Sequence, residues 1–249
     1  SNPLLMGGDQ SIYVVVSAIV LAGAIGFPIL VNFKDALKLK MRRLWARVRG
    51  RRFVCPVHVY DLNTKLVLAT TFVLLAVGAG GFFVLEYDNT LRGMSLWEKC
   101  AQSIFNALTP RSAGFASVSP AAFLPATLLL VMFQMWVGGA SQSMAGGIKV
   151  NTLAVVVLNL RSVVYGHRGA SAWHRGLAVP SVRRAHAVVA LSIAAYAVYA
   201  FVILLLEPGM GARALLFETL SALFTVGSSL GATEHLCDAS KVVLSTAMF

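Results

Sequence analysis

The chain has 249 residues, of which 57% are hydrophobic and only 12% are charged. A water-soluble domain of this length carries about twice that charged fraction, so the composition excludes an ordinary soluble protein. The formal net charge of +11 would suit a nucleic-acid partner, but the positive charges are gathered in two segments of the chain. Such clustering is typical of membrane-protein topology and argues against nucleic-acid binding.

Four segments contain no Asp, Glu, Lys or Arg and are long enough to cross the roughly 30 Å hydrocarbon core of a bilayer. They cover residues 11–33, 66–85, 121–148 and 185–206. The first is interrupted by Gly23, Gly26 and Pro28, and a further apolar run covers 242–249. These segments predict an all-α membrane protein with several spans.

Basic residues dominate two of the connecting segments. Residues 34–52 hold nine Lys or Arg against one acid, and residues 161–184 hold five Arg and no acid. Basic loops of membrane proteins stay on the cytoplasmic side. We therefore predict that both segments are loops that face the cytoplasm, and that the loops at 86–98 and 207–213 face outward.

The order of elements recurs along the chain. The crossing at 66–85 is followed by a short helical candidate at 96–108, the irregular stretch LTPRSAGF at 108–115 and a long apolar run. The crossing at 185–206 is followed by a helical candidate at 212–224, the stretch TVGSSLGATEH and another apolar run.

The tripeptides Ser112-Ala113-Gly114 and Thr225-Val226-Gly227 occupy the same place in the two units, with their glycines 113 residues apart. This recurrence predicts an internal repeat, and a chance match between two hairpins is the alternative.

Irregular backbone at membrane depth is tolerated only where it is buried in protein or lines a wet cavity. A span, a half-length helix, a glycine-bearing loop and a second span make up a re-entrant pore unit, in which loop carbonyls replace the hydration shell of an ion. Glycine permits the backbone angles that this requires. Ser112 and Thr225 would add hydroxyl oxygens or brace the loop. Arg111 is expected to brace the first loop by pairing with Glu98 or Glu218, because a charge at this depth needs a partner.

The segment GGASQSMAGGIK at 138–149 is a poor helix interior, since it contains four glycines and three polar side chains. One interpretation is a broken helix whose loop lies below the filter and gates the pathway. The other is a flexible helix end with Lys149 extended to the membrane interface. The candidate gate residues are Gly138, Gly139, Ser141, Gln142, Ser143, Gly146, Gly147 and Lys149.

LTPRSAGF, GGASQSMAGGIK and FETLSALFTVGSSLG, in this order between spans, resemble the TrkH/KtrB/HKT superfamily of potassium transporters, with the bacterial members most similar. The resemblance implies span–pore helix–filter loop–span units, repeated four times around one pore. Gly114 would then be the third filter glycine, Gly227 the fourth, and 138–149 the gate loop. GAIGFPI at 23–29 looks like the exit span of the second repeat.

The resemblance divides the chain into three parts. Residues 1–53 would hold the exit span of an incomplete second repeat and a basic loop, 54–184 the third repeat, and 185–249 a fourth repeat with a truncated last span. The first two filter loops are absent, and an arginine that the family carries after a Met-Phe pair would fall beyond Met248-Phe249. We therefore expect a fragment.

The resemblance implies a pore-forming subunit of a potassium uptake system in the bacterial inner membrane, with K⁺, and also Na⁺, as candidate ions and no covalent cofactor. It also implies a homodimer that binds a cytoplasmic ring of nucleotide-sensing regulatory subunits. Two alternatives stay open. One is a non-conducting membrane scaffold, and the other is an intramembrane serine hydrolase that uses Ser141 or Ser143 with His186.

Overall fold

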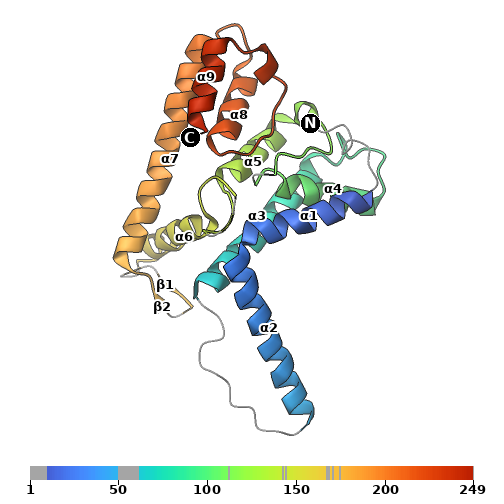
Figure 1. The fold of residues 1–249 in the computed structure, drawn as a ribbon, viewed down its shortest axis with the longest axis vertical. Helices are drawn as coiled ribbons and strands as arrows, with labels where there is room; N and C mark the ends of the chain where they lie inside the picture. Colours follow the sequence, from blue (N-terminus) through green and yellow to red (C-terminus); the bar gives the residue numbers. More distant parts are fainter. Residues whose placement is uncertain are drawn as a thin grey trace.

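The computed structural model describes residues 10–49, 62–111, 113–141, 143, 145–166, 169, 171–173 and 175–248, and it is almost entirely helical (Figure 1). In chain order the helices are α1 (Gln10–Ile25), α2 (Phe27–Val48), α3 (Leu62–Leu85), α4 (Leu96–Leu108), α5 (Pro125–Trp136), α6 (Val150–Val164), α7 (Val179–Leu206), α8 (Ala212–Leu223) and α9 (Asp238–Ala247). Short 3₁₀ turns cover Pro120–Ala122 and Thr233–His235. Strands β1 (Ser171–Ala172) and β2 (Arg175–Gly176) pair antiparallel between α6 and α7.

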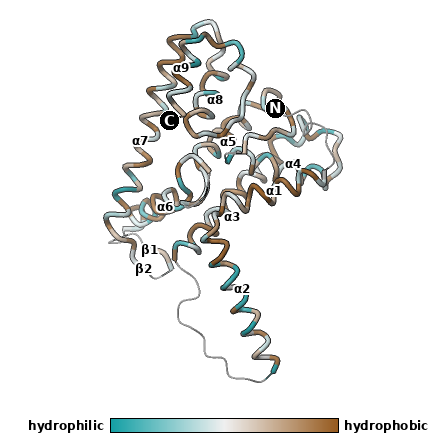
Figure 2. The backbone as a smooth tube through the Cα atoms, viewed as in Figure 1, coloured by the Kyte–Doolittle hydropathy of each residue, from teal (hydrophilic) through white to brown (hydrophobic). Residues whose placement is uncertain are grey.

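Among the described residues, two helices, α3 and α7, are by themselves long and apolar enough to cross a membrane. A third candidate span results if α1 and α2 are taken together. Hydrophobic residues dominate α1, α3 and α7, whereas hydrophilic residues recur along α2 (Figure 2). The distribution confirms the prediction of an all-α membrane protein.

The first predicted span, 11–33, is not one straight helix. It breaks between α1 and α2 at an angle of 95°. Gly26 takes a φ of +84°, a conformation that ends a right-handed helix, and Pro28 provides no backbone N–H to continue the hydrogen-bond ladder. The prediction that 34–52 is a loop is wrong for 34–48, which is helical. Lys, Arg, Leu and Met favour helix, and they predominate there.

The recurring order of elements is present in three dimensions. α3 packs against the short helix α4, as α7 does against α8, and an irregular segment and another helix follow in each unit. One carboxylate–amide contact is also shared. Glu86 accepts from the N–H of Leu124, which caps α5, and Glu207 accepts from the N–H of Cys237, which caps α9.

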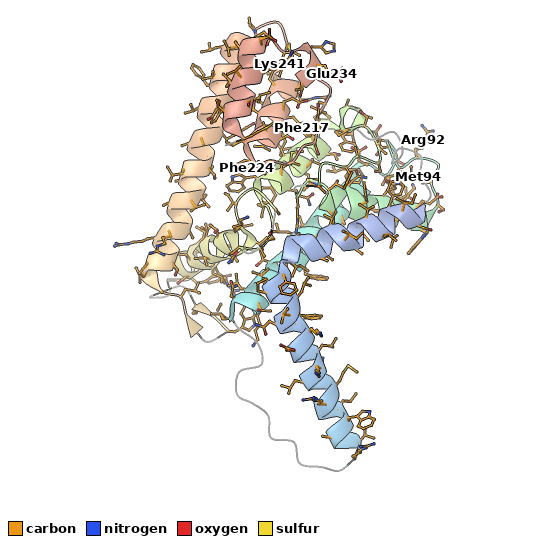
Figure 3. All side chains as sticks on the ribbon, viewed as in Figure 1. Arg92, Met94, Phe217, Phe224, Glu234 and Lys241 are labelled. Atoms are coloured by element: carbon orange, nitrogen blue, oxygen red, sulfur yellow. The ribbon has the colours of Figure 1, made fainter. Side chains whose placement is uncertain are left out.

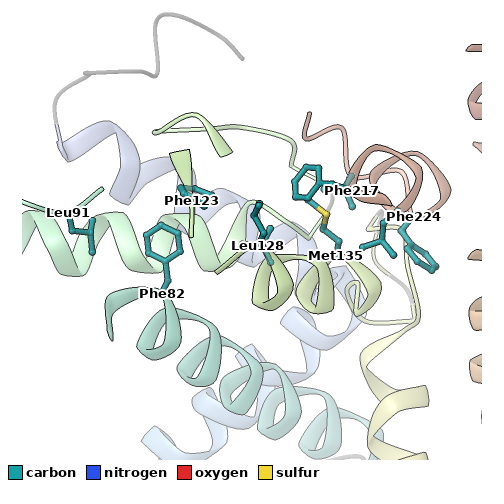
Figure 4. Close-up of a cluster of buried hydrophobic side chains, with 10 residues drawn as sticks. Phe82, Leu91, Phe123, Leu128, Met135, Phe217 and Phe224 are labelled. Atoms are coloured by element: carbon teal, nitrogen blue, oxygen red, sulfur yellow. The ribbon is translucent and has the colours of Figure 1, made fainter. Parts of the chain in front are cut away.

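A buried cluster joins the two units at their centre (Figure 4). The rings of Phe82 and Phe123, both in the first unit, pack edge to face with their centroids 5.2 Å apart. Met135 extends the cluster toward Phe217 and Phe224 of the second unit. In a bilayer, lipid tails are as apolar as these side chains, so close packing rather than transfer from water favours the contact. The cluster therefore holds the loops that follow α4 and α8 next to each other.

Candidate functional site

The short helices α4 and α8 both lead into glycine loops. α4 begins at a capping box, in which Ser95 accepts from the N–H of Glu98 while Glu98 accepts from that of Ser95. Its 13 residues span about 20 Å, too short to cross a bilayer. At its end, Thr109 accepts from the N–H groups of Ala113 and Gly114. The carboxyl ends of α4 and α8, which carry the negative end of the helix dipole, therefore lie next to the loops.

The two glycine loops meet face to face. Gly114 has φ +65° and Gly227 has φ +84°, both in the left-handed region. A Cβ atom added to Gly114 would lie 2.8 Å from the carbonyl oxygen of Val226 and 3.3 Å from that of Gly227. A Cβ atom on Gly227 would lie 3.8 Å from the Cα of Gly114. Two carbonyl groups of the second loop thus approach the first loop at a point that only glycine leaves open.

The other predicted residues of these loops differ in burial and in backbone conformation. Ala113 is half-buried and Val226 is buried. Thr225 adopts a φ of +51°, which is uncommon for a residue other than glycine. Ser112 lies outside the described residues.

Polar side chains of α4 and α8 hold the chain as it leaves each loop. Asn106 donates to the hydroxyl of Ser117 at 2.9 Å. Glu218 accepts from the hydroxyl of Ser229 and from the N–H of Leu230. It also accepts from the hydroxyl of Thr233 at 2.8 Å. Sequence reasoning missed Asn106, whose burial and hydrogen bond to Ser117 are visible only in the structure.

The predicted pairing of Arg111 with Glu98 or Glu218 is wrong. Arg111 is 3% exposed, and its Nε, Nη1 and Nη2 atoms have no hydrogen-bond partner in the structure. Glu218 is occupied by the returning segment, and Glu98 caps the far end of α4. Both carboxylates therefore accept hydrogen bonds from nearby residues and not from Arg111.

The segment at 138–149 is a broken helix, because α5 ends at Trp136 and helix resumes only at Val150. The two ends of the loop are tied together by backbone hydrogen bonds. Gly138 donates to Ile148 at 2.9 Å, Ile148 donates to Trp136 at 2.9 Å, and Val150 donates to Gly139 at 3.0 Å. Gly147, with φ +70°, makes the turn back into this bridge. The ends are thus fixed, and the part between them forms a closed loop.

That loop lies against the second glycine loop and the end of α1. A Cβ atom on Gly146 would overlap the carbonyl oxygen of Phe224 and Oγ1 of Thr225. On the other side, Ala140 donates to the carbonyl oxygen of Ala24 at 2.9 Å. Lys149 donates to the carbonyl oxygen of Ala145 within the loop. The interpretation in which Lys149 extends to the membrane interface stays open beside the gate interpretation.

The remaining predicted residues of this loop are placed as follows. Ser143 donates its hydroxyl to the carbonyl oxygen of Ala140, Ser141 is exposed, and Gln142 lies outside the described residues. His186 contacts the carbonyl oxygen of Val182 at 2.9 Å and the amide of Asn159. Neither contact provides the serine–histidine pair that the hydrolase alternative requires. Within the described part of the chain, no three His, Cys, Asp or Glu side chains gather as a metal site.

The model of the TrkH family, described as a cation transport protein, matches residues 7–249. The chain belongs to the TrkH family. It is 30% identical over 244 residues to the Ktr system potassium uptake protein B of Bacillus subtilis, covering 97% of this chain and 51% of that protein. It is also 30% identical over 251 residues to the potassium/sodium uptake protein NtpJ of Enterococcus hirae, covering 98% and 52%.

A solved structure, the potassium transporter TrkH from Vibrio parahaemolyticus, matches with a TM-score of 0.68 over 96% of this chain and 49% of that one. At 20% identity this match shows the fold. This TrkH-family chain spans about half the length of the curated relatives that it matches.

Beside Gly227, the TrkH-family chain has a cavity of about 460 Å³ between α8, the second glycine loop and α9. Thr225, Ser228, Ser229 and Glu218 are among the residues that line it. Hydroxyl and carbonyl oxygens are the ligands that alkali cations accept in place of water. Lys241 of α9 also lines the cavity, together with the apolar side chains of Ala222, Leu244 and Met248, so its wall is largely apolar.

Proposed function

We propose that this chain forms two sides of a passive K⁺ pathway, as part of the pore-forming subunit of a potassium uptake system. The segments 112–114 and 225–227 act as filter loops, whose carbonyl oxygens replace the water around the ion. The observation that carries the proposal is the meeting of these loops, with Gly114 against the carbonyl oxygens of Val226 and Gly227. Residues 54–184 and 185–249 are then two successive pore units.

The electrostatics of the two units support a cation. The carboxyl ends of α4 and α8 run into the filter loops, and a helix carries about half a negative charge at that end. The segments 112–114 and 225–227 contain no charged side chain. The buried Arg111 directly precedes the first of them. The ligands are therefore backbone dipoles, which bind an ion weakly enough to release it.

We propose that the loop at 138–149 is the gate. Gly146 lies against Phe224 and Thr225, at the base of the second filter loop, so the loop must withdraw before an ion can leave in that direction. Backbone hydrogen bonds fix Gly138, Gly139 and Ala140 at one end and Ile148 and Val150 at the other, which leaves 141–147 as the part that moves.

The proposal for the partners and the location rests on the family resemblance and on the charge pattern. We propose a bacterial inner-membrane protein that acts as a homodimer, has its basic segments on the cytoplasmic side and binds a ring of nucleotide-sensing regulatory subunits there. Na⁺ is a second candidate ion, because one relative is named a potassium/sodium uptake protein.

Replacement of Gly227 by Ser tests the filter assignment. The full-length protein is expressed in cells without other K⁺ uptake, and uptake of K⁺ and Na⁺ is measured for each variant. The added hydroxymethyl group narrows the site and offers a competing oxygen, so the preference for K⁺ should fall. Gly231→Ser is the matched control, because Gly231 has φ +86° against +84° at Gly227 and nothing within 4 Å of an added Cβ. Equal ion preference in both variants would refute the assignment.

Deletion of 141–145 tests the gate. The deletion removes the tip but keeps the residues that tie the two ends of the loop. We expect higher K⁺ flux with unchanged ion preference, and flux that stays the same or falls would contradict a gating role. A wild-type protein without any K⁺ flux would favour the alternative of a non-conducting scaffold.

A further inference from the structure

Helix α2 leaves the body of the protein after its second turn. Ile29 is buried against Val67 and Ala140, and Asn32 donates to the hydroxyl of Thr64 at 3.1 Å. Thr64 lies in the first turn of α3, so Asn32 is level with the end of that span. Beyond it, α2 extends away from the other described elements (Figure 3), and most of the described side chains of 33–48 are exposed.

The projecting part of α2 carries an apolar stripe. Leu37, Met41, Leu44, Trp45 and Val48 follow the helical spacing of four, three, one and three residues, which places them on one face. Their exposed fractions range from 46% at Leu37 to 82% at Val48. A stripe of this kind is stable only when another apolar phase covers it.

Basic side chains flank the stripe. At 100° per residue, Lys38 falls on one flank and Lys40 on the other, Lys34 precedes the stripe by one turn, and Arg42 lies farther round, about 20° from Asp35. All four are exposed. The one acid of α2, Asp35, falls on the face opposite the stripe. The guanidinium of Arg49 lies 3.9 Å from the ring centre of Trp45, which extends the basic flank past the end of the helix.

We propose that residues 33–48 form an interfacial helix that binds anionic lipid headgroups on the bilayer face where α3 begins. The apolar stripe enters the acyl region, and the flanking Lys and Arg side chains contact phosphate groups. Trp45 is at the level that tryptophan prefers, between headgroups and tails. The binding does not depend on the ion pathway.

Two features favour a lipid surface over a protein partner. The bend of 95° at Gly26 turns α2 across the axis of α1, so α2 does not continue in the direction of that helix. The helix also starts at the end of a span, where its stripe is already beside the acyl chains. Pairing with a second copy is disfavoured, because six basic residues and one acid give each α2 a net charge of +5.

Spin labels on the two faces of α2 test the proposal. The chain is freed of native thiols by Cys55→Ser, Cys100→Ser and Cys237→Ser, the last of which keeps a helix-capping side chain. A single nitroxide is then placed at Leu44 on the stripe or, as the matched control, at Asp35 on the opposite face. The protein is reconstituted in vesicles of phosphatidylcholine with or without phosphatidylglycerol. Collision with oxygen and with a water-soluble nickel chelate reports the depth of each label.

With phosphatidylglycerol present, the Leu44 label should be reached by oxygen and shielded from the nickel chelate, while the Asp35 label stays accessible to the chelate. In the combined variant Lys34→Gln, Lys38→Gln and Lys40→Gln, the equilibrium constant for docking should fall roughly fivefold per charge removed. High salt should have the same effect on the unmodified helix.

Three outcomes would overturn the proposal. The first is equal access of the chelate to both labels in anionic vesicles, which would place α2 in water. The second is equal shielding of both labels, which would mean that protein covers the helix. The third is shielding of Leu44 that is unchanged by phosphatidylglycerol, by salt and by charge removal. Because no ion flux is measured, the result is independent of the filter and gate assignments.

Discussion

Replacing Gly114 by Ala is the most direct test of contact between the two glycine loops. The φ of +65° at Gly114 costs an alanine about 1–2 kcal/mol. The new Cβ would also stand 2.8 Å from the carbonyl oxygen of Val226, a backbone atom that cannot turn aside as a side chain would. Overpacking of this kind costs about 1–3 kcal/mol more. The variant should therefore lose about 2–5 kcal/mol in total.

Gly93→Ala separates the two contributions. Gly93 has φ +82° and nothing within 4 Å of an added Cβ, so that variant carries only the backbone cost. In detergent, the melting temperature followed by tryptophan fluorescence changes by about 2–4 °C per kcal/mol for a chain of this size. Gly114→Ala should thus melt about 2–12 °C below Gly93→Ala. It should also lose stabilisation by K⁺, which Gly93→Ala should keep. Equal melting temperatures of the two variants would refute the contact.

Three further variants probe single side chains. Glu218→Gln replaces one acceptor oxygen by a donor opposite Ser229 and should cost about 1.5–3 kcal/mol, seen as a lower melting temperature and weaker K⁺ preference. Arg111→Met removes a buried guanidinium without a hydrogen-bond partner and should raise the melting temperature. A loss of stability above about 1 kcal/mol would instead mean that the guanidinium has an acceptor in the protein. The pKa of Glu207 is lowered from 4.5 chiefly because its carboxylate accepts from the N–H of Cys237. Stability from this contact is present above pH 4.5 and is lost as the pH falls through the lowered pKa. The melting temperature of Glu207→Gln should therefore fall less in acid than that of the wild-type protein.

Parts of the site could be predicted because their signals are local. The short helix at 96–108 has its start marked by Ser95 and Glu98, three residues apart, and its end marked by Thr109-Pro110, and the structure places α4 over that range. The break at 138–149 could be predicted because four glycines within twelve residues disfavour a helix whatever surrounds them.

Other parts could not be predicted, because they depend on how the loops fold back on the helices. Arg111 pairs with neither expected carboxylate, since Glu218 finds three donors in the returning loop. The sequence left two positions for Lys149, in the gate loop or at the membrane interface. Its hydrogen bond to the carbonyl oxygen of Ala145 depends on how the loop closes. Asn106 was missed because its partner, Ser117, becomes a neighbour only when the chain turns back at Gly114.

The sequence by itself determined the membrane class, the two principal spans and the positions at which helix must stop. Those properties follow from the length of charge-free segments and from the backbone preferences of Gly and Pro, which act within a few residues. Only the tertiary structure decided that Gly114 meets Gly227, that Gly146 lies under Phe224 and that α2 turns away at Gly26. These are contacts and directions between segments up to 113 residues apart, and packing between helices sets them rather than the preference of any residue.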